Sequence, residues 1–198
     1  MEPFDADRTL QSMSADADDA EDWERSVAGD GEAFGRIFDR HRDRIARHSR
    51  RLVPNAHEVD DVVAVTFLEA WRRRQQVRLV DQSVLPWLLV TATNTAQNLR
   101  RSARRHRAFL ERLPEPPDAS DSTESIEGGV AMDALRNLGL SDRQVVVLCV
   151  LEGFSTNEAA TALGVPPGTI KSRLSRAKRR LAHQVRPLAQ LTTTPEEA

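Results

Sequence analysis

Residues 155–181, STNEAATALGVPPGTIKSRLSRAKRRL, decide the fold of the C-terminal part of the chain. The first half predicts a short helix, because Ser155 and Glu158 have the spacing of a capping box. Gly164 follows that helix and is the residue type that most readily ends one in a left-handed conformation. Pro167 then suits the first turn of a second helix, since its φ angle is already fixed. This stretch therefore predicts two helices joined by a short turn.

The second of these helices has two distinct faces. Ile170, Leu174 and Ala177 recur at spacings of four and three, so they form one narrow apolar stripe. The opposite face carries short polar side chains and arginines, which suits a helix inserted in the major groove of DNA. The predicted base-contacting residues are Thr169, Ser172, Arg173 and Arg176, and the same face includes Lys171, Ser175 and Arg179. The alternative is an ordinary helical hairpin with a solvated basic face.

The rest of the C-terminal domain is also predicted to be helical. Residues 130–138 form a short apolar segment, and Ser141 with Gln144 predicts a second capping box. We expect this domain, with its helix-turn-helix, to span residues 130–186 and to be followed by a disordered tail over residues 187–198.

The composition predicts where the N-terminal domain begins and ends. Residues 113–129, LPEPPDASDSTESIEGG, combine three prolines, two glycines and five acids without an apolar period, which is typical of a flexible acidic linker. Residues 1–18 are acidic, polar and aperiodic, as expected of a disordered tail. The N-terminal domain is therefore predicted over residues 19–112.

Three long helices are predicted in this N-terminal domain. Asp30 can cap the first, and Asn55 with Glu58 can cap the second. The third begins near Pro86, which a first turn tolerates, and runs to about Leu110. No useful β-like alternation occurs anywhere in the sequence. The predicted fold class is all-α, with two small helical domains.

The second helix of this domain is apolar on two sides. Ala64, Leu68 and Trp71 lie on the side away from the core, next to Asp60 and Asp61. An apolar patch rimmed by acids favours docking on a basic partner. The alternative is a helix buried on both sides. The core side is formed by Val59, Val62, Val63, Thr66 and Ala70.

One face of the third helix suits a nucleic acid. It combines a tryptophan, amides and arginines, which bind exposed bases and phosphates of single strands. The residues of this face are Trp87, Thr91, Asn94, Asn98, Arg101 and Arg105. Residues 75–85, just before the helix, form a loop that can close over an unstacked base. The alternative is a solvated arginine face.

The charges are sorted along the chain although the net charge is only −2. Residues 36–112 carry seventeen arginines against eight acids, and residues 129–186 carry nine bases against four acids. The acids are concentrated before and between these two basic blocks. This arrangement favours two modules that each bind a polyanion, although an excess of arginine can also reflect genomic base composition.

Several functions are excluded by what the sequence lacks. The five histidines occur singly, and Cys149 is the only cysteine, so no metal site is expected. No phosphate-binding loop or nucleophile elbow occurs, and an enzyme or cofactor-binding protein is not predicted. No apolar run approaches the ~18 residues of a membrane span, and the N-terminus does not resemble a secretory signal.

Together the two domains resemble the bacterial RNA polymerase sigma factors. Domain two of that family is similar to residues 30–105, through DGEAF, VDDVVAVTFLEAWR, PWLLVTATN and LRR, and domain four is similar to residues 140–181. With only these domains and a short linker, the chain resembles the extracytoplasmic-function (ECF) group. The resemblance implies a factor that binds core polymerase, reads the −35 element with domain four and melts the −10 element with domain two.

The resemblance also implies roles for particular residues. Asp60, Asp61, Phe67, Leu68 and Trp71, together with Ala64, match the helix that docks on the clamp coiled coil of the largest polymerase subunit. Residues 75–85 with Trp87, Asn94, Arg100 and Arg101 match the part that melts and reads the −10 element. Residues 169–176 match the helix that reads the −35 element, and the helices around residues 145–151 and 179–181 would meet the flap of the second-largest subunit. Where the family usually has a glutamine–glutamate pair, this chain has Ala64 and Val65, which removes polar docking groups.

The same resemblance implies a cytoplasmic protein with no catalytic activity and no cofactor. Its implied partners are core RNA polymerase, promoter DNA and, as is frequent in the family, an anti-sigma factor. Two other interpretations follow from the residues. One is a stand-alone helix-turn-helix regulator that binds duplex DNA without polymerase. The other is a helical interaction protein whose arginine faces bind an acidic partner.

Overall fold

The computed structural model describes residues 19–53, 55–110, 134–135 and 137–189. Within these residues the named elements are all helical, and the β-type pairing is one isolated bridge between Val80 and Ser83. The all-α prediction is therefore confirmed. The predicted acidic linker and the tail at residues 1–18 lie outside the described part of the chain.

The helices follow one another in two groups. The N-terminal group comprises an unlabelled helix over residues 19–27, α2 (Gly31–Arg50), α3 (Ala56–Arg72) and α4 (Leu85–Leu110). The C-terminal group comprises α6 (Leu140–Val146), the π-helix η1 (Val147–Leu151), α7 (Thr156–Leu163) and α8 (Pro167–Ala189). Helix α8 thus continues three residues past the predicted end of the C-terminal domain at residue 186.

Most predicted helix ends are confirmed by their capping geometry. The Asp30 side chain accepts hydrogen bonds from the first turn of α2, and the Asn55 side chain accepts one from the Glu58 amide at 2.9 Å. Ser155 and Glu158 form a complete capping box at α7. Gly164 ends α7 with a φ of 63°, in the left-handed region that glycine adopts without strain.

The predicted capping box of Ser141 and Gln144 is wrong. The residue at the start of α6 is Gly139, which makes no side-chain capping bond. The Gln144 side chain instead donates a hydrogen bond to Asn94 on α4, at 2.6 Å. The spacing of Ser141 and Gln144 suits a capping box, but the side-chain amide of Gln144 is engaged in a contact with another helix.

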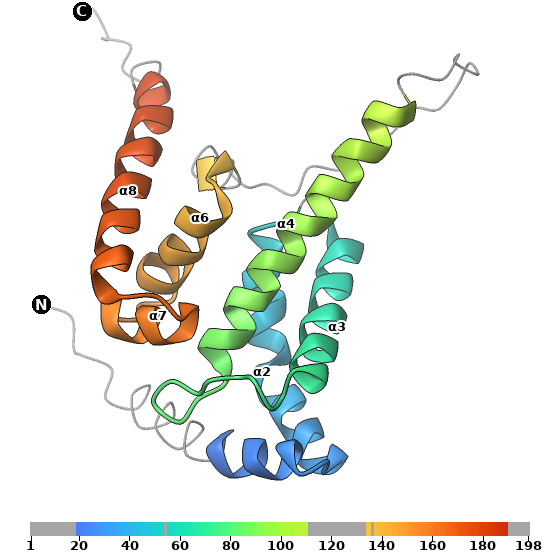
Figure 1. The fold of residues 1–198 in the computed structure, drawn as a ribbon. Coiled ribbons are helices and arrows are strands. Elements are labelled where there is room, and N and C mark those ends of the chain that lie inside the picture. Colours follow the sequence, from blue (N-terminus) through green and yellow to red (C-terminus); the bar gives the residue numbers. More distant parts are fainter. Residues whose placement is uncertain (1–18, 54, 111–133, 136, 190–198) are drawn as a thin grey trace, which may run out of the picture.

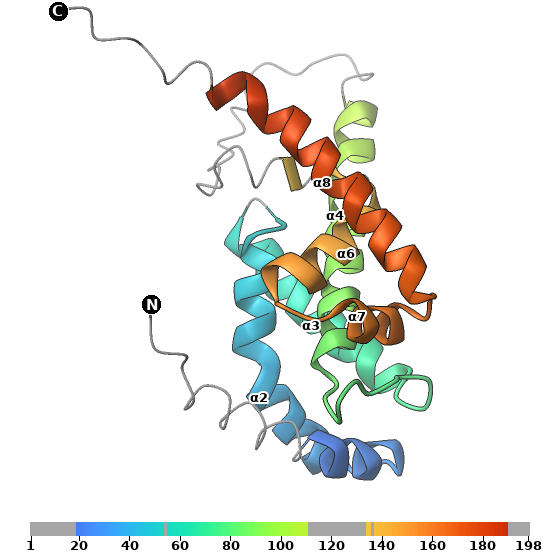
Figure 2. The ribbon, with the colours of Figure 1, turned by 90° about the vertical axis from the view of Figure 1, so that its left-hand side faces the viewer.

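The helix over residues 19–27 was not predicted, because its acids resemble those of the preceding tail. Trp23 is only 4% exposed and packs against Phe34 of α2, with ring centroids 6.3 Å apart. This helix lies across the lower end of α2 (Figure 2). One buried aromatic thus attaches an acidic segment to the domain.

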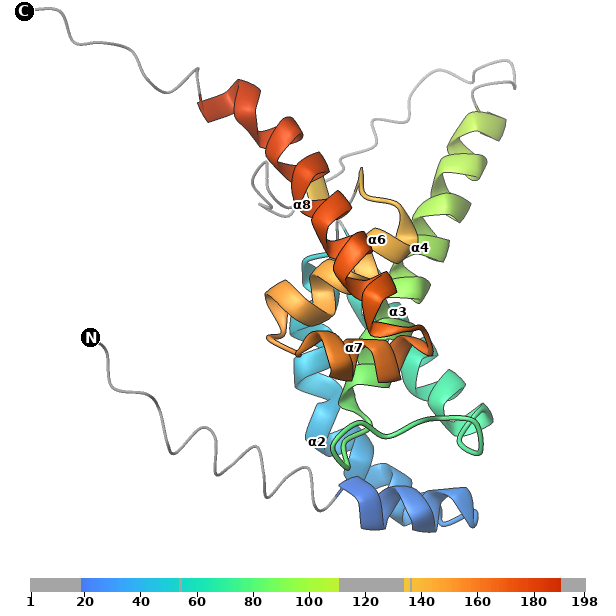
Figure 3. The ribbon, with the colours of Figure 1, turned by 60° about the vertical axis from the view of Figure 1, so that its left-hand side comes forward.

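The two groups of helices share one continuous apolar core. In the N-terminal group, α2, α3 and α4 pack against one another around Ile37, Val62 and Leu88. In the C-terminal group, α8 packs on α6 and α7 through Ile170 and Ala177. Helix α4 also contacts α6, η1 and α7, so it is the helix of the N-terminal group that packs against the C-terminal group (Figures 1 and 3).

Candidate nucleic-acid interface

Helix α8 presents the polar face that the sequence predicts. Ile170 and Ala177 are fully buried, and Leu174 and Leu181 pack partly buried against the core. The capped α7 and the left-handed Gly164 fix how α8 leaves the turn. Thr169 and Arg173 are half-buried, and the exposed side chains of the face are Lys171, Ser172, Ser175, Arg176 and Arg179.

Arg176 makes a contact that the sequence did not indicate. Its guanidinium binds Asp142 of α6, with Nη2 2.6 Å from Oδ1 and Nε 3.1 Å from both oxygens. Arg180 donates to the same carboxylate at 3.0 Å, and the Asp142 side chain is only 3% exposed. In this structure Arg176 therefore joins α8 to α6 while its side chain stays 47% exposed, and its contact with a base remains a prediction.

The predicted face of α4 is partly covered by the C-terminal helices. Trp87 is half-buried and packs against the core, Thr91 is half-buried, and Asn94 accepts the hydrogen bond from Gln144. Farther along α4, Asn98, Arg101 and Arg105 are exposed. Arg100, half-buried and engaged within the protein, lies off this row. The two ends of the face thus differ in their access to a ligand.

The loop before α4 has a tight, strained tip. Val80 and Ser83 pair through two backbone hydrogen bonds of 3.0 and 2.9 Å. Between them Asp81 and Gln82 have φ angles of 49° and 66°, the left-handed region that favours glycine. At the other end of the loop, the Arg74 guanidinium lies 4.3 Å above the Trp71 ring. The sequence placed a loop here but gave no sign of its shape.

Helix α3 carries the predicted acid-rimmed patch on its outer side. Leu68 is 55% exposed and Val65, which was not predicted, is 39% exposed. Asp60, Asp61 and Ala64 are exposed beside them. We call these five residues the α3 patch. Trp71 is half-buried at its edge, with its ring 5.1 Å from that of Phe34.

Phe67 does not belong to this surface, which corrects its predicted placement. It is only 4% exposed, and its ring packs edge-on against Phe38 at 4.8 Å and Phe34 at 6.4 Å. Phe67 therefore fixes α3 to α2 and contributes to the core. A partner docking on α3 would meet the neighbouring exposed side chains.

Glu152 joins the two groups of helices electrostatically. It follows η1, and its Oε2 accepts hydrogen bonds from Arg44 of α2 at 3.0 and 3.2 Å. Arg51 Nη1 and His48 Nδ1 lie 3.5 and 3.7 Å from its Oε1. Burial disfavours the charge, but the attraction of His48 and Arg44 outweighs it and lowers the pKa of Glu152 from 4.5 to about 2. The carboxylate is therefore ionised at neutral pH.

The similarity of the chain to known proteins agrees with this arrangement. Residues 37–106 match the family described as Sigma-70 region 2, and residues 130–181 match that described as Sigma-70, region 4. The ECF RNA polymerase sigma factor SigM of Mycobacterium tuberculosis is 33% identical over 165 residues, which cover 83% of each chain. The chain belongs to the ECF sigma factors. It accordingly binds core RNA polymerase and directs promoter-specific initiation of transcription.

Further relatives are consistent with this ECF sigma factor assignment. BldN of Streptomyces coelicolor is 32% identical over 183 residues, covering 85% of this chain and 67% of BldN. Among solved structures, CnrH in complex with the cytosolic domain of CnrY superposes with a TM-score of 0.58 at 25% identity. That similarity covers 89% of this sigma factor and 99% of CnrH. The assignment does not favour the alternative of a stand-alone regulator.

Two further observations concern the described part of this sigma factor. No helix within it is both long and apolar enough to cross a membrane. Nor do those residues form a group of three or more histidine, cysteine or acidic side chains that could hold a metal ion.

Proposed function

We propose that the two groups of helices divide promoter recognition between them, with α8 reading the −35 element in the major groove. The observation that carries this proposal is the exposed polar face of α8 opposite a buried apolar stripe. Residues near the start of such a helix reach base edges, whereas basic residues farther along meet phosphates. Thr169, Ser172 and Arg173 are the foremost candidates for base contacts, because they precede the part of α8 that is held by Asp142.

We assign the −10 element to α4 and the loop over residues 75–85. Trp87, Thr91 and Asn94 provide stacking and hydrogen-bonding groups near the loop, as single-stranded bases require. Farther along the helix, an amide and three positively charged groups are placed to bind the sugar–phosphate backbone of the DNA: Asn98, Arg100, Arg101 and Arg105. Asn94 must exchange its bond to Gln144 for one to DNA, so promoter binding is expected to separate α4 from α6.

The α3 patch is the surface that we assign to core polymerase. Exposed Leu68 and Val65 supply apolar area, and Asp60 and Asp61 complement a basic partner. By the family resemblance, that partner is the clamp coiled coil of the largest subunit, with the flap of the second-largest subunit near η1 and α8. Catalysis and its cofactors belong to polymerase, so no catalytic activity is assigned to this chain. As a partner of polymerase it is expected to act in the cytoplasm.

We further propose that an anti-sigma factor regulates this protein. CnrH, which resembles it over most of its length, was solved in complex with the cytosolic domain of CnrY. Such a partner would compete with polymerase or DNA for the surfaces described above. We therefore expect an anti-sigma domain to bind on α3 or α8.

The proposed function is tested by transcription of fragmented genomic DNA with purified core polymerase, with and without this protein. We expect new transcripts whose start sites share two upstream sequence elements. Transcripts that do not depend on the protein, together with tight duplex binding by the free chain, would instead support a stand-alone regulator.

A matched pair of variants tests the polymerase surface. Leu68→Glu places a charge in the α3 patch and should weaken core binding about tenfold or more, as for a buried interface anchor. Ala56→Glu places the same charge at the exposed first residue of α3, about 18 Å away at 1.5 Å per residue. The control should bind core normally. Equal affinity of both variants would refute the assignment of this surface.

A further inference from the structure

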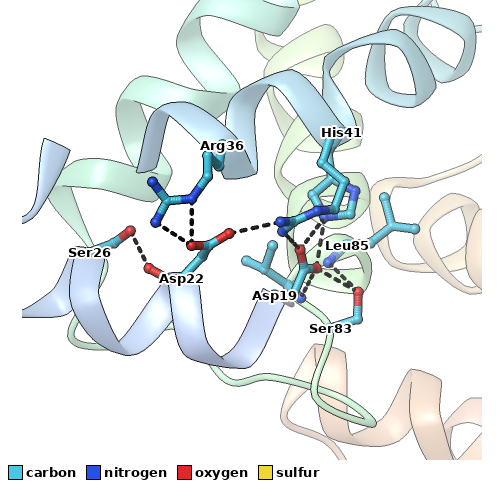
Figure 4. A network of polar contacts seen from close by, with 9 residues as sticks. Asp19, Asp22, Ser26, Arg36, His41, Ser83 and Leu85 are labelled. Atoms are coloured by element: carbon cyan, nitrogen blue, oxygen red, sulfur yellow. Dashed lines mark hydrogen bonds and ion pairs between the residues drawn. The ribbon is translucent and has the colours of Figure 1, made fainter. Parts of the chain in front are cut away.

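The first described residue, Asp19, is buried at a contact between three segments of the chain. Its side chain is fully buried, although aspartate is seldom found in a core. His41 Nε2 of α2 lies 2.7 and 2.9 Å from its two oxygens, and Arg40 donates to Oδ1. Figure 4 shows Asp19 between the His41 side chain and the loop that leads into α4. So many donors around one carboxylate require it to be ionised.

The same carboxylate binds the end of the loop before α4. Its Oδ2 accepts hydrogen bonds from the Ser83 hydroxyl at 3.0 Å and from the Val84 amide at 3.2 Å. The Ser83 oxygen in turn accepts one from the Leu85 amide at 3.3 Å. Asp19 and Ser83 therefore satisfy amides at the start of α4, a role normally filled by a residue adjacent in sequence. Here the acceptor comes from 65 residues away.

This attachment lies directly beside the strained tip of the loop. Asp81 and Gln82 both adopt left-handed backbone angles without being glycine, and such residues persist only where the surroundings fix them. Ser83 closes the tip by pairing with Val80, and the same Ser83 is held by Asp19. The contact to Asp19 thus fixes one side of a two-residue turn.

We propose that Asp19 is a positioning residue for the −10 reading loop, holding residues 80–84 in the shape that receives an unstacked promoter base. The inference rests on the proposed function of that loop. It assigns a role to the acidic N-terminal helix, which contacts the loop through Asp19. Asp19 itself needs no contact with DNA.

Asp22 provides a matched control on the same helix. Its carboxylate belongs to the same polar network, and accepts hydrogen bonds from Arg36 at 2.6 and 2.9 Å and from Arg40 at 2.8 Å. These partners belong to α2, whereas those of Asp19 include the loop. Asp19→Asn and Asp22→Asn therefore each remove one buried negative charge next to Arg40, but only the former alters the loop attachment.

The first measurement is amide hydrogen exchange in the free, full-length protein. Asp19→Asn should speed exchange at Val84 and Leu85 about tenfold or more, as expected when a charge-assisted hydrogen bond is lost. Asp22→Asn should leave these two amides within about threefold of the wild type. If Asp19→Asn does not fold, Ser83→Ala takes its place. This variant removes the hydroxyl that links Asp19 to Leu85 and leaves the contacts of Asp19 with α2 in place. It should have the same effect at Leu85.

The second measurement is base preference at the −10 element. A promoter identified by the genomic transcription experiment is randomised at its −10 positions and transcribed by core polymerase with each variant. Asp19→Asn or Ser83→Ala should reduce the preference at one or more positions about fivefold to tenfold, while affinity for core polymerase stays at the wild-type value. A merely structural role would lower activity on all sequences equally.

The outcomes separate the two proposals. An unchanged base preference in a variant whose loop amides exchange faster would overturn the positioning role, as would unchanged exchange. If the wild-type protein itself showed no −10 preference, the proposed function would fail. The exchange rates of Val84 and Leu85 would then still decide whether Asp19 fixes the loop.

Discussion

Arg176 is both a predicted DNA contact and a structural contact between α8 and α6. From the sequence it is a candidate for contacting a −35 base, and in the structure it binds a nearly buried Asp142. A guanidinium that leaves this carboxylate for DNA must give up the charge-assisted hydrogen bonds that its Nε and Nη2 donate. Its contribution to DNA affinity is therefore reduced by the contribution that it makes to the folded domain.

The stability of the free protein tests this structural role. Arg176→Ala should lower the free energy of unfolding, since Asp142 loses the hydrogen bonds from Arg176 and keeps the one from Arg180. Lys171→Ala removes an exposed cation from the same helix and should change stability by less than about 0.5 kcal/mol. Urea denaturation without DNA measures both. Equal stability of the two variants would show that the Asp142 contact contributes nothing.

The three residues whose contacts differ from the sequence prediction do so for one physical reason. Phe67, Gln144 and Arg176 each stand at a position whose local pattern allows an exposed side chain, and each is engaged by another helix. Sequence periodicity gives the angle of a side chain around its own helix. It does not tell which neighbouring helix lies there, so these contacts were not predictable.

At the scale of elements the sequence was much more informative. The starts of α2, α3, α4, α7 and α8 and the end of α7 were predicted, because Asp30, Asn55, Ser155, Gly164 and the prolines act locally. The π-helix η1 and the helix over residues 19–27 were not. Widening of α6 into η1 depends on packing, and the acidic helix depends on Trp23 and on partners from distant parts of the chain.

Two glycines of the helix-turn-helix should respond oppositely to the same substitution. Gly164→Ala forces a left-handed φ of 63° on alanine and should lower the free energy of unfolding by about 1 kcal/mol. Its new methyl group would meet only Arg78 Nη1, at an ordinary 3.8 Å, so the loss comes from the backbone.

The control for this substitution lies four residues farther along. Gly168 is in the first turn of α8 with nothing within 4 Å of an added methyl group. Gly168→Ala should stabilise the protein by up to about 1 kcal/mol, because alanine loses less backbone entropy in a helix. Thermal or urea denaturation of both variants gives the signs. A loss of stability in both would mean that steric contact, and not φ, decides the effect.

At the scale of the whole molecule, polar contacts join the two groups of helices, and one of them engages Asn94, a predicted DNA-contacting residue. Asn94 of α4 is bound by Gln144 of α6, and Glu152 is bound by Arg44, His48 and Arg51. The sequence predicted two domains separated by a linker but gave no sign that they pack together. Each contact joins residues at least 50 positions apart in the chain, which no local pattern can reveal.

The acid dependence of stability tests the Glu152 contact. Its pKa in the folded chain is about 2 against an ordinary 4.5, so its charge stabilises the packed form above about pH 4.5. That contribution is lost as the pH falls from about 4.5 toward 2. The shift corresponds to about 3 kcal/mol, and we expect about 2 kcal/mol because Arg44 and Arg51 are partly exposed.

Glu152→Gln removes this charge with little change in shape. Urea denaturation should find the variant less stable than the wild type at pH 7 by about 2 kcal/mol, with the difference shrinking below pH 4.5. Small-angle scattering at pH 7 should give a larger radius of gyration, because the contact joins η1 to α2. Glu24→Gln, on the exposed side of the helix over residues 19–27, is the control for loss of one acid. A stability difference between wild type and Glu152→Gln that stays constant from pH 7 to pH 3 would contradict an ionised, paired Glu152.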